Sequence, residues 1–427
     1  MPLLGGVRLV GLRQPDFLKL WSSQTVSLLG SEITLLALPL TAILTLKASP
    51  LELGILSAAQ SAPFLLLSLP AGVWVDRFPR RRLLITADLG RALLLGSVPV
   101  AALLGWLRIE LLYLVGIGAG ALTAIFDVAY QAFVPQVVPR EHLVERNTDL
   151  EISRSTAQIV GPSSAGLLIQ WLTAPVAIAA DAISFIVSGL AFVSVRAPDP
   201  MPVTRKEDRS LLVEIREGLG VVIHDPVLRI LAGAASAYNL FGNVLFAVLL
   251  VYATRDLGLP PVTIGLILSV AGPAALVGAL LASRIPRWLG PGRTLVGALT
   301  IGALGRTLIL AAGGPPELMV VLLVAARVLL SVWVPIYSVT ALSLRQAITP
   351  DHLQGRVTAT MRFVGWGTLP IGSLIGGALG STIGLRPTIG VAVLGTLFAV
   401  AWFVLSPIRR LRQAEAPGEV ALPERVD

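Results

Sequence analysis

Two acidic residues, Glu32 and Asp127, lie inside long stretches of the chain that are otherwise apolar. Each shares a helical face with other polar residues, because offsets of three and four positions stack on one side of a helix. A carboxyl group that has apolar surroundings on one side and a cavity on the other can exchange a proton near neutral pH. Glu32 and Asp127 are therefore candidate proton carriers.

Both acids also have a structural interpretation. Glu32 could stay protonated and form hydrogen bonds to a neighbouring helix. Asp127 could form a structural or gating ion pair with Arg91, and the cost of an isolated buried charge favours this pair. Asp88 lies one helical turn before Arg91 and could be its second partner. Asp181 lies toward the end of its apolar stretch, where we expect it near the outer interface.

A second set of polar residues could line a cavity that binds a small molecule, because its members recur on shared helical faces. Neutral amides and hydroxyls suit a site that must hold a ligand without trapping it, and Arg327 could bind an anionic group or pair with an acid such as Glu32. Hydrogen bonds between packed helices are the alternative role. The candidates are Gln24, Ser31, Tyr130, Gln131, Asn239, Asn243, Arg327 and Ser331.

Apolar helices must position these residues. The chain has 427 residues, of which 55% are hydrophobic and 14% charged, and its mean hydropathy is +0.81, which is too apolar for a soluble protein. Only a helix satisfies the backbone across a membrane, and about 20 apolar residues suffice. We predict twelve membrane spans, at 20–45, 51–73, 83–105, 111–135, 155–173, 175–195, 229–252, 261–283, 294–312, 318–344, 359–382 and 386–406.

An internal repeat divides the chain. Leu89-Gly90-Arg91 recurs as Leu304-Gly305-Arg306, and the polar stretch that follows Val195 separates the copies. Two similar bundles can move about a site between them. We expect a fold of two pseudo-symmetric six-helix bundles, at 1–195 and 229–406, with a cytosolic linker at 196–228 and a cytosolic tail at 407–427.

The distribution of positive charge predicts the orientation. The chain has 33 Lys and Arg residues and a net charge of +8, and most of these residues fall in cytosolic segments if the N-terminus is inside. We therefore expect a multi-pass protein of the cytoplasmic membrane with both termini in the cytosol. The arginines should contact membrane lipids. A nucleic-acid partner is not expected, because the predicted topology leaves no soluble basic domain.

Several kinds of chemistry are not expected. Cysteine is absent and the three histidines lie in or near loops, so we predict neither a metal site nor a cofactor. No Gly-x-x-x-x-Gly-Lys-Ser/Thr loop is present to bind ATP. No nucleophile, base and orienting group can be assembled, so an enzyme is not expected either.

Motifs along the whole chain carry a family resemblance. Residues 71–82 read Ala-Gly-Val-Trp-Val-Asp-Arg-Phe-Pro-Arg-Arg-Arg between two apolar stretches, and further motifs occur at 17–30, 126–135, 161–166 and 181–185. On these residues the chain resembles the major facilitator superfamily of transporters. Within it, the chain is most similar to the branch that contains the enterobactin exporter and macrolide efflux proteins.

The resemblance implies a role for the motif at 71–82, which in this superfamily latches the cytosolic ends of the two halves in the outward-open state. The residues that carry over are Gly72, Asp76, Arg77 and Arg81. A carboxylate near guanidinium groups and a helix N-terminus supports such a latch. The second half has Ala282 where the acid would be, so we expect one latch to dominate.

The function that the resemblance implies is secondary active efflux. We expect a monomer that exports small amphipathic molecules, drug-like or siderophore-like, by proton antiport and alternating access. Gly161-Pro162 resembles the superfamily's antiporter motif and favours export. A lysophospholipid flippase of the same fold and a non-transporting membrane receptor are the alternatives, although a static receptor has little use for a latch at Asp76.

Overall fold

The computed structural model describes residues 15–75, 77–139, 142–196, 219–350 and 353–410. Within these ranges the regular secondary structure is helical and contains no strand. The chain forms two compact units, each described by itself: unit 1 comprises Met1–Ala48 and Ala59–Arg205, and unit 2 comprises Ser49–Ala58 and Lys206–Asp427. The predicted all-helical membrane fold is confirmed.

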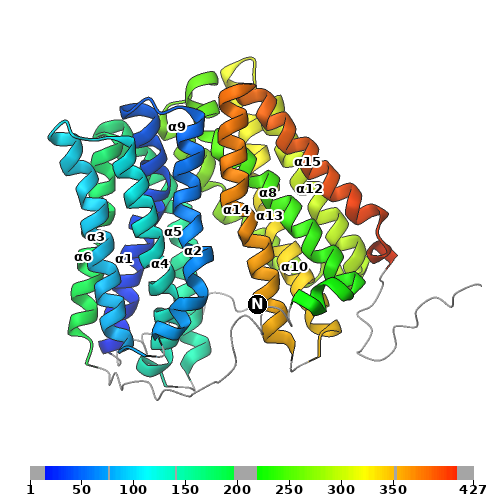
Figure 1. The fold of residues 1–427 in the computed structure, drawn as a ribbon, viewed down its shortest axis with the longest axis horizontal. Helices are drawn as coiled ribbons and strands as arrows, with labels where there is room; N and C mark the ends of the chain where they lie inside the picture. Colours follow the sequence, from blue (N-terminus) through cyan, green and yellow to red (C-terminus); the bar gives the residue numbers. More distant parts are fainter. Residues whose placement is uncertain (1–14, 76, 140–141, 197–218, 351–352, 411–427) are drawn as a thin grey trace, which may run out of the picture. The chain divides into compact units, whose positions relative to one another are not determined.

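Unit 1 is built from long helices that follow one another along the chain (Figure 1). In this unit, α1 packs against α5 and α6, and α3 packs against α4 and α6. The first turns of α2 belong to unit 2, and its remaining turns belong to unit 1. The bounds are α1 Pro15–Leu40, continued by the π-helical turn η2 Thr41–Thr45, α2 Pro50–Val75, α3 Arg80–Leu103, α4 Ile109–Val137, α5 Leu143–Trp171 and α6 Ala174–Ser194.

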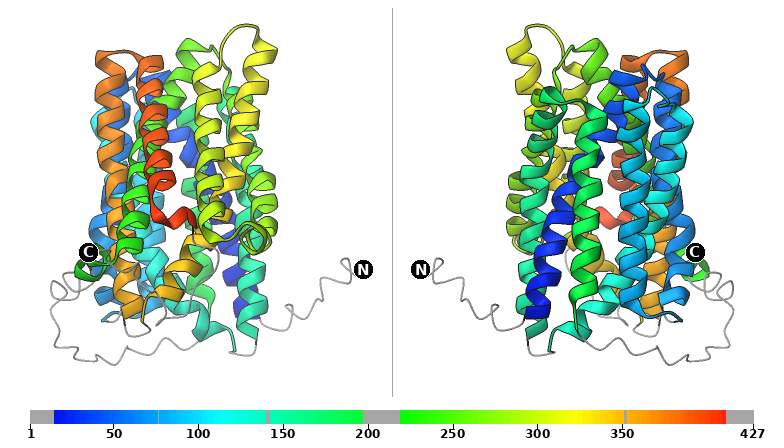
Figure 2. Two further views of the ribbon diagram at one scale, coloured as in Figure 1. Left: turned by 90° about the vertical axis from the view of Figure 1, so that its right-hand side faces the viewer. Right: turned by 90° about the vertical axis from the view of Figure 1, so that its left-hand side faces the viewer.

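Unit 2 repeats this packing with its own helices. Here α8 packs against α14 and α15, α12 packs against α13 and α15, and α10 packs against α13. In the views of Figure 2 the long helices of each unit run lengthwise beside their partners. The bounds are α8 Pro226–Val251, η4 Tyr252–Asp256, α9 Pro261–Ser269, α10 Ala271–Ala282, α11 Ile285–Leu289, α12 Pro291–Ala311, α13 Pro316–Ile348, α14 Gln354–Thr382, α15 Leu385–Leu405 and η6 Pro407–Arg410.

The repeat extends to local backbone geometry. Both α1 and α8 end in a π-helical turn, and a residue with positive φ follows each turn, Lys47 at 53° and Gly258 at 63°. Glycine adopts this conformation freely, whereas lysine does so at a cost. The same helix ending at equivalent points of both units supports the internal repeat inferred from the sequence.

Eleven of the described helical segments are long and apolar enough to cross a membrane. One of them, Pro261–Ala282, consists of α9 and α10 with a break at Val270. The remaining predicted span, 155–173, lies in α5. This helix is 29 residues long, but its first turns read Leu-Val-Glu-Arg-Asn-Thr-Asp-Leu-Glu, so only its later turns are apolar enough for lipid.

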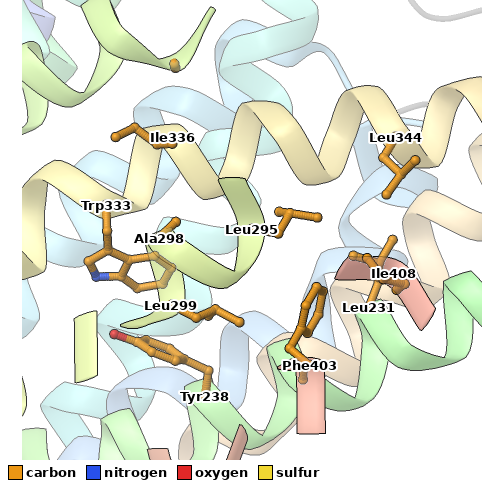
Figure 3. Packing of buried hydrophobic residues seen from close by; sticks show 12 residues of the cluster. Leu231, Tyr238, Leu295, Ala298, Leu299, Trp333, Ile336, Leu344, Phe403 and Ile408 are labelled. Carbon is orange, nitrogen blue, oxygen red and sulfur yellow. The ribbon is translucent and has the colours of Figure 1, made fainter. Parts of the chain in front are cut away.

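Aromatic rings and small residues set the helix spacing in unit 2. Tyr238 of α8 and Trp333 of α13 face each other with ring centroids 4.4 Å apart, beside Ala298 and Leu299 of α12 (Figure 3). Gly376 of α14 lies so close to α8 that a Cβ atom there would meet the backbone of Val244. Small residues allow backbones to approach in this way, which is how helices associate in lipid.

We predict that Gly376→Ala destabilises the protein, because its methyl group must push α14 away from α8. Overpacking of this kind costs about 1–3 kcal/mol. The measurement is the thermal unfolding midpoint of the purified protein in detergent. Gly297→Ala is the matched control, because a Cβ atom at Gly297 meets no heavy atom of the described structure within 4 Å. Equal midpoints for the two variants would contradict this account of the helix interface.

Candidate functional site

A buried ion pair forms the centre of the candidate site in unit 1. Arg91 of α3 donates a hydrogen bond to Asp88 Oδ1, one turn earlier on the same helix. The guanidinium carbon lies 4.3 Å from the ring centroid of Phe126 in α4 and 4.0 Å from that of Phe185 in α6. Arg91 Nη1 also lies 3.5 Å from Thr123 Oγ1. The pairing of Asp88 with Arg91 expected from their spacing is present, and two aromatic faces surround the cation.

Two further carboxyl groups act on the same guanidinium. Asp127 of α4 and Asp181 of α6 both interact electrostatically with Arg91. Asp181 Oδ1 accepts a hydrogen bond of 3.0 Å from Ser184 Oγ. Arg91 therefore stands among three carboxyl groups, contributed by three neighbouring helices of one unit.

Asp181 is buried within unit 1, since the residue is only 1% exposed. It lies two turns into α6, and α1 crosses it at Gly30, where a Cβ atom would meet the Asp181 carboxyl group and Ser184 Oγ. The missing side chain at Gly30 makes room for the acid between the two helices. The sequence alone does not show that Gly30 lies opposite Asp181, because this requires knowing that α1 packs against α6.

The charges of this cluster do not balance if all its carboxyl groups are ionised. One guanidinium neutralises one carboxylate, and an isolated charge inside a membrane protein is costly. Asp88 Oδ2 and Ser188 Oγ are both buried, and Ser188 lies against the Asp88 carboxyl group. The arrangement can lower its net charge by binding protons on the carboxyl groups that Arg91 does not neutralise.

Glu32 lies on α1, two residues beyond Gly30, and is partly exposed. It packs against α5 at Gly161, where a Cβ atom would collide with the Glu32 side chain. The glycine before Pro162 thus accommodates an acid at the α1–α5 contact. The remaining candidates on α1 are partly exposed as well, and Gln24 Oε1 is a buried acceptor without a hydrogen-bond donor in the described part of the chain.

The two cavity candidates on α4 lie in different surroundings. Tyr130 stacks on Phe126 with ring centroids 5.7 Å apart, and its hydroxyl group is buried with no hydrogen bond to the described residues. Gln131 is exposed. Tyr130 thereby joins the aromatic group that covers Arg91, whereas Gln131 points away from the buried core.

The candidates on α8 lie against α14. Asn239 Nδ2 donates to Gly365 O at 3.0 Å, and Asn243 Nδ2 donates to Asn239 O at 3.0 Å. Gly365 lies within α14 a little before Pro370, which interrupts the helix hydrogen bonding of that region. The Asn239 contact corresponds to the helix-packing role that the sequence left open, whereas the Asn243 amide bonds within its own helix.

The candidates on α13 are one helical turn apart. Ser331 is buried, and Arg327 lines a cavity within unit 2 whose other walls are apolar. The structure thus brings Asp88, Arg91 and Asp127 together in unit 1 and places Arg327 beside a cavity in unit 2. No cluster of three or more His, Asp or Glu side chains that could hold a metal ion occurs in the described ranges.

The latch candidates lie where α2 leads into α3. Asp76 is outside the described residues, and the surroundings of Gly72 are likewise not described. Arg77 is exposed, whereas Arg81 Nη1 donates to Val195 O at 2.5 Å, next to the end of α6. Arg80 Nη1 donates to Ala132 O of α4 at 3.0 Å. The first-turn arginines of α3 therefore hold the ends of two neighbouring helices in the same unit.

Known proteins resemble this chain along nearly its full length. A family model described as transmembrane secretion effector matches residues 7–426. The chain is 30% identical over 422 residues to the multidrug efflux pump Tap of Mycolicibacterium fortuitum, covering 95% of this chain and 99% of that protein. It is 25% identical over 405 residues to macrolide efflux protein A of Streptococcus pyogenes, covering 93% and 97%.

Among solved structures, that of the nucleoside transporter NupG is similar in fold. It superposes with a TM-score of 0.76 over 91% of this chain and 99% of that one, at 11% sequence identity.

We predict that Asp88→Asn lowers the stability of the protein by about 3 kcal/mol, because the buried Arg91 loses the carboxylate to which it donates a hydrogen bond. Glu145→Gln is the control, since it removes an exposed partner of His142 at 3.8 Å and should change stability by less than about 1 kcal/mol. Thermal unfolding in detergent measures both. Equal stability of the two variants would show that the Asp88–Arg91 pair is energetically unimportant.

Proposed function

The chain belongs to the transmembrane secretion effector family of the major facilitator superfamily, and from this membership we propose that it exports small amphipathic molecules by proton antiport and alternating access. It is a multi-pass membrane transporter and not an enzyme. The names of its relatives, multidrug efflux pump and macrolide efflux protein, favour export of drug-like or siderophore-like molecules over uptake of nutrients.

The observation that carries the proton part of the proposal is the cluster around Arg91. Asp88, Asp127 and Asp181 lie around the Arg91 guanidinium, and Arg154 also acts on Asp127, so the three carboxyl groups outnumber the two cations unless one of them holds a proton. Glu32, on the α1–α5 contact, provides a partly exposed carboxyl group in the same unit. Together these acids can bind protons from one side of the membrane and release them to the other.

The proton gradient is a sufficient source of energy. One proton moving inward across about 100 mV releases roughly 2.3 kcal/mol, which drives export against a substantial concentration gradient. The sequence contains no ATP-binding loop of the Gly-x-x-x-x-Gly-Lys-Ser/Thr type. Coupling to protons therefore matches both the available side chains and the energy that transport requires.

The protein is proposed to lie in the cytoplasmic membrane. Both termini are then in the cytosol. The arginine-rich turn between α2 and α3 then faces the cytosol, where positive charge is retained and anionic lipid head groups are available. The protein works as a monomer, because each chain already contains the two halves that alternating access needs.

Removal of a carboxyl group that binds coupling protons should uncouple transport from the gradient. We predict that Asp181→Asn reduces gradient-driven uptake of substrate into inverted vesicles by about tenfold or more, and that Glu32→Gln and Asp127→Asn reduce it too. Macrolides, tetracyclines, siderophores and lysolipids form the substrate panel. Glu145→Gln, an exposed acid of the same unit, is the control. Proton antiport is refuted if all three variants transport as well as the unmodified protein.

The latch gives a separate prediction about conformation. We expect Asp76→Asn to shift the resting population toward the inward-open state, because the acid that holds the cytosolic helix ends together is lost. Distance distributions between spin labels on those helix ends measure the shift. Asp225→Asn is the control, since Asp225 only caps the start of α8 and asparagine caps equally well. Unchanged distances in Asp76→Asn would contradict the latch.

A further inference from the structure

The interior of unit 2 carries positive charge. Arg306 of α12 and Arg327 of α13 both lie well inside membrane-spanning helices. From Pro226 to Leu405 the sequence contains three acidic residues: Asp256 at the end of η4, Glu317 in the first turn of α13, and Asp351, which is outside the described residues. In unit 1, by contrast, the acidic residues Glu32, Asp88, Asp127 and Asp181 lie well within the helices α1, α3, α4 and α6. The two repeats are therefore similar in packing but differ in the charged residues that their helices contain.

The two arginines of unit 2 differ in their surroundings. Arg306, the counterpart of Arg91 in the repeat, is buried and bonded to neutral groups: it donates to Thr396 Oγ1 and to Tyr238 O, and lies over the Tyr238 ring at 3.8 Å. Gly242 of α8 leaves the space that its guanidinium fills. Arg306 is thus enclosed by α8 and α15 and has no access to a ligand, whereas Arg327 faces a cavity.

The cavity beside Arg327 lies entirely within unit 2. It has a volume of about 60 Å³, and Arg327 is its one charged lining residue among walls that are otherwise apolar. Residues from α8, η4, α9, α12 and α13 form these walls, among them Leu250, Ala253, Ile264, Ile309 and Leu330. At roughly 10–15 Å³ for each water-sized group, this space holds about four to six such groups, the size of a short alkyl chain or one aromatic ring.

We propose that this cavity binds a compact amphipathic anion, with its apolar part against the leucine and isoleucine walls and its anionic group on Arg327. A guanidinium binds carboxylate and phosphate oxygens by paired, charge-assisted hydrogen bonds. The apolar walls disfavour small hydrated ions, which would lose their water without compensation. A cationic ligand would face Arg327, the one charged residue of the cavity lining. The anion is therefore the ligand that suits both the walls and the charge.

This inference rests on the proposed function in one respect, since it gives the exported molecules an anionic group that unit 2 recognises. Protons then bind among the acids of unit 1, and the anionic part of the substrate binds at the arginine of unit 2. Binding at the cavity is measured at equilibrium without a proton gradient. Its failure would leave proton antiport intact, and a failure of gradient-driven transport would leave the binding site intact.

The probe is radiolabelled hexanoate, measured by equilibrium dialysis against the protein in nanodiscs of zwitterionic lipid, with empty nanodiscs to correct for partitioning. Hexanol and hexylamine have the same chain length with a neutral and a cationic end. We expect saturable binding of hexanoate, about tenfold or more weaker in Arg327→Gln and only partly weakened in Arg327→Lys, which keeps the charge but not the paired hydrogen bonds. Arg293→Gln, an exposed arginine of the same unit, should bind hexanoate normally.

A second variant tests the cavity without changing the charge. Ala253→Leu fills part of the apolar wall and should weaken hexanoate binding while Arg327 is intact. Hexanoate affinity that is unchanged in both Arg327→Gln and Ala253→Leu, or hexylamine binding as tight as hexanoate binding, overturns the proposal. Nanodiscs that contain anionic lipid identify the source of the ligand: displacement of hexanoate indicates a lipid head group, and undiminished binding indicates a free solute.

Discussion

A charge inside a membrane protein must be stabilised by groups close to where it lies, and this constraint organises the structure. Arg91 meets it through Asp88 on the preceding turn and through two aromatic faces from α4 and α6. The helices that supply these groups pack around α3, so the electrostatics and the packing of unit 1 depend on each other. Of the two further acids near Arg91, Asp127 also interacts with Arg154, and Asp181 accepts a hydrogen bond from Ser184. We propose that these acids bind the coupling protons.

The internal repeat provides two bundles of the same architecture with different interior charges. Arg91 and Arg306 occupy equivalent positions, yet Arg91 is paired with an acid while Arg306 is bonded to a hydroxyl group and a backbone carbonyl. Duplicated helix packing does not require duplicated chemistry, because a buried arginine can be stabilised by neutral acceptors when space and geometry allow. The proposed division of roles assigns the protons to one half of the protein and the substrate to the other.

The fold could be predicted from the sequence, because a helix that crosses lipid needs a certain length and hydropathy and the apolar stretches have both. The pairing of Asp88 with Arg91 could also be predicted, since residues one turn apart on a helix are neighbours. The burial of Asp181 could not, because it depends on Gly30 facing it from another helix. Nor does a sequence show whether Asn239 faces a cavity or a neighbouring helix, and the structure places its amide on the backbone of α14. Contacts within a helix follow from spacing, whereas contacts between helices require the packing.

The central claim is that carboxyl groups around Arg91 hold protons at neutral pH. Infrared spectroscopy of the protein tests it directly, because a protonated carboxyl group absorbs at a frequency distinct from that of a carboxylate. With isotope-labelled aspartate, we expect a protonated band at neutral pH that weakens in Asp181→Asn and persists in Asp149→Asn. A spectrum at neutral pH that contains only ionised aspartate would contradict the claim, since the cluster would then carry its full negative charge.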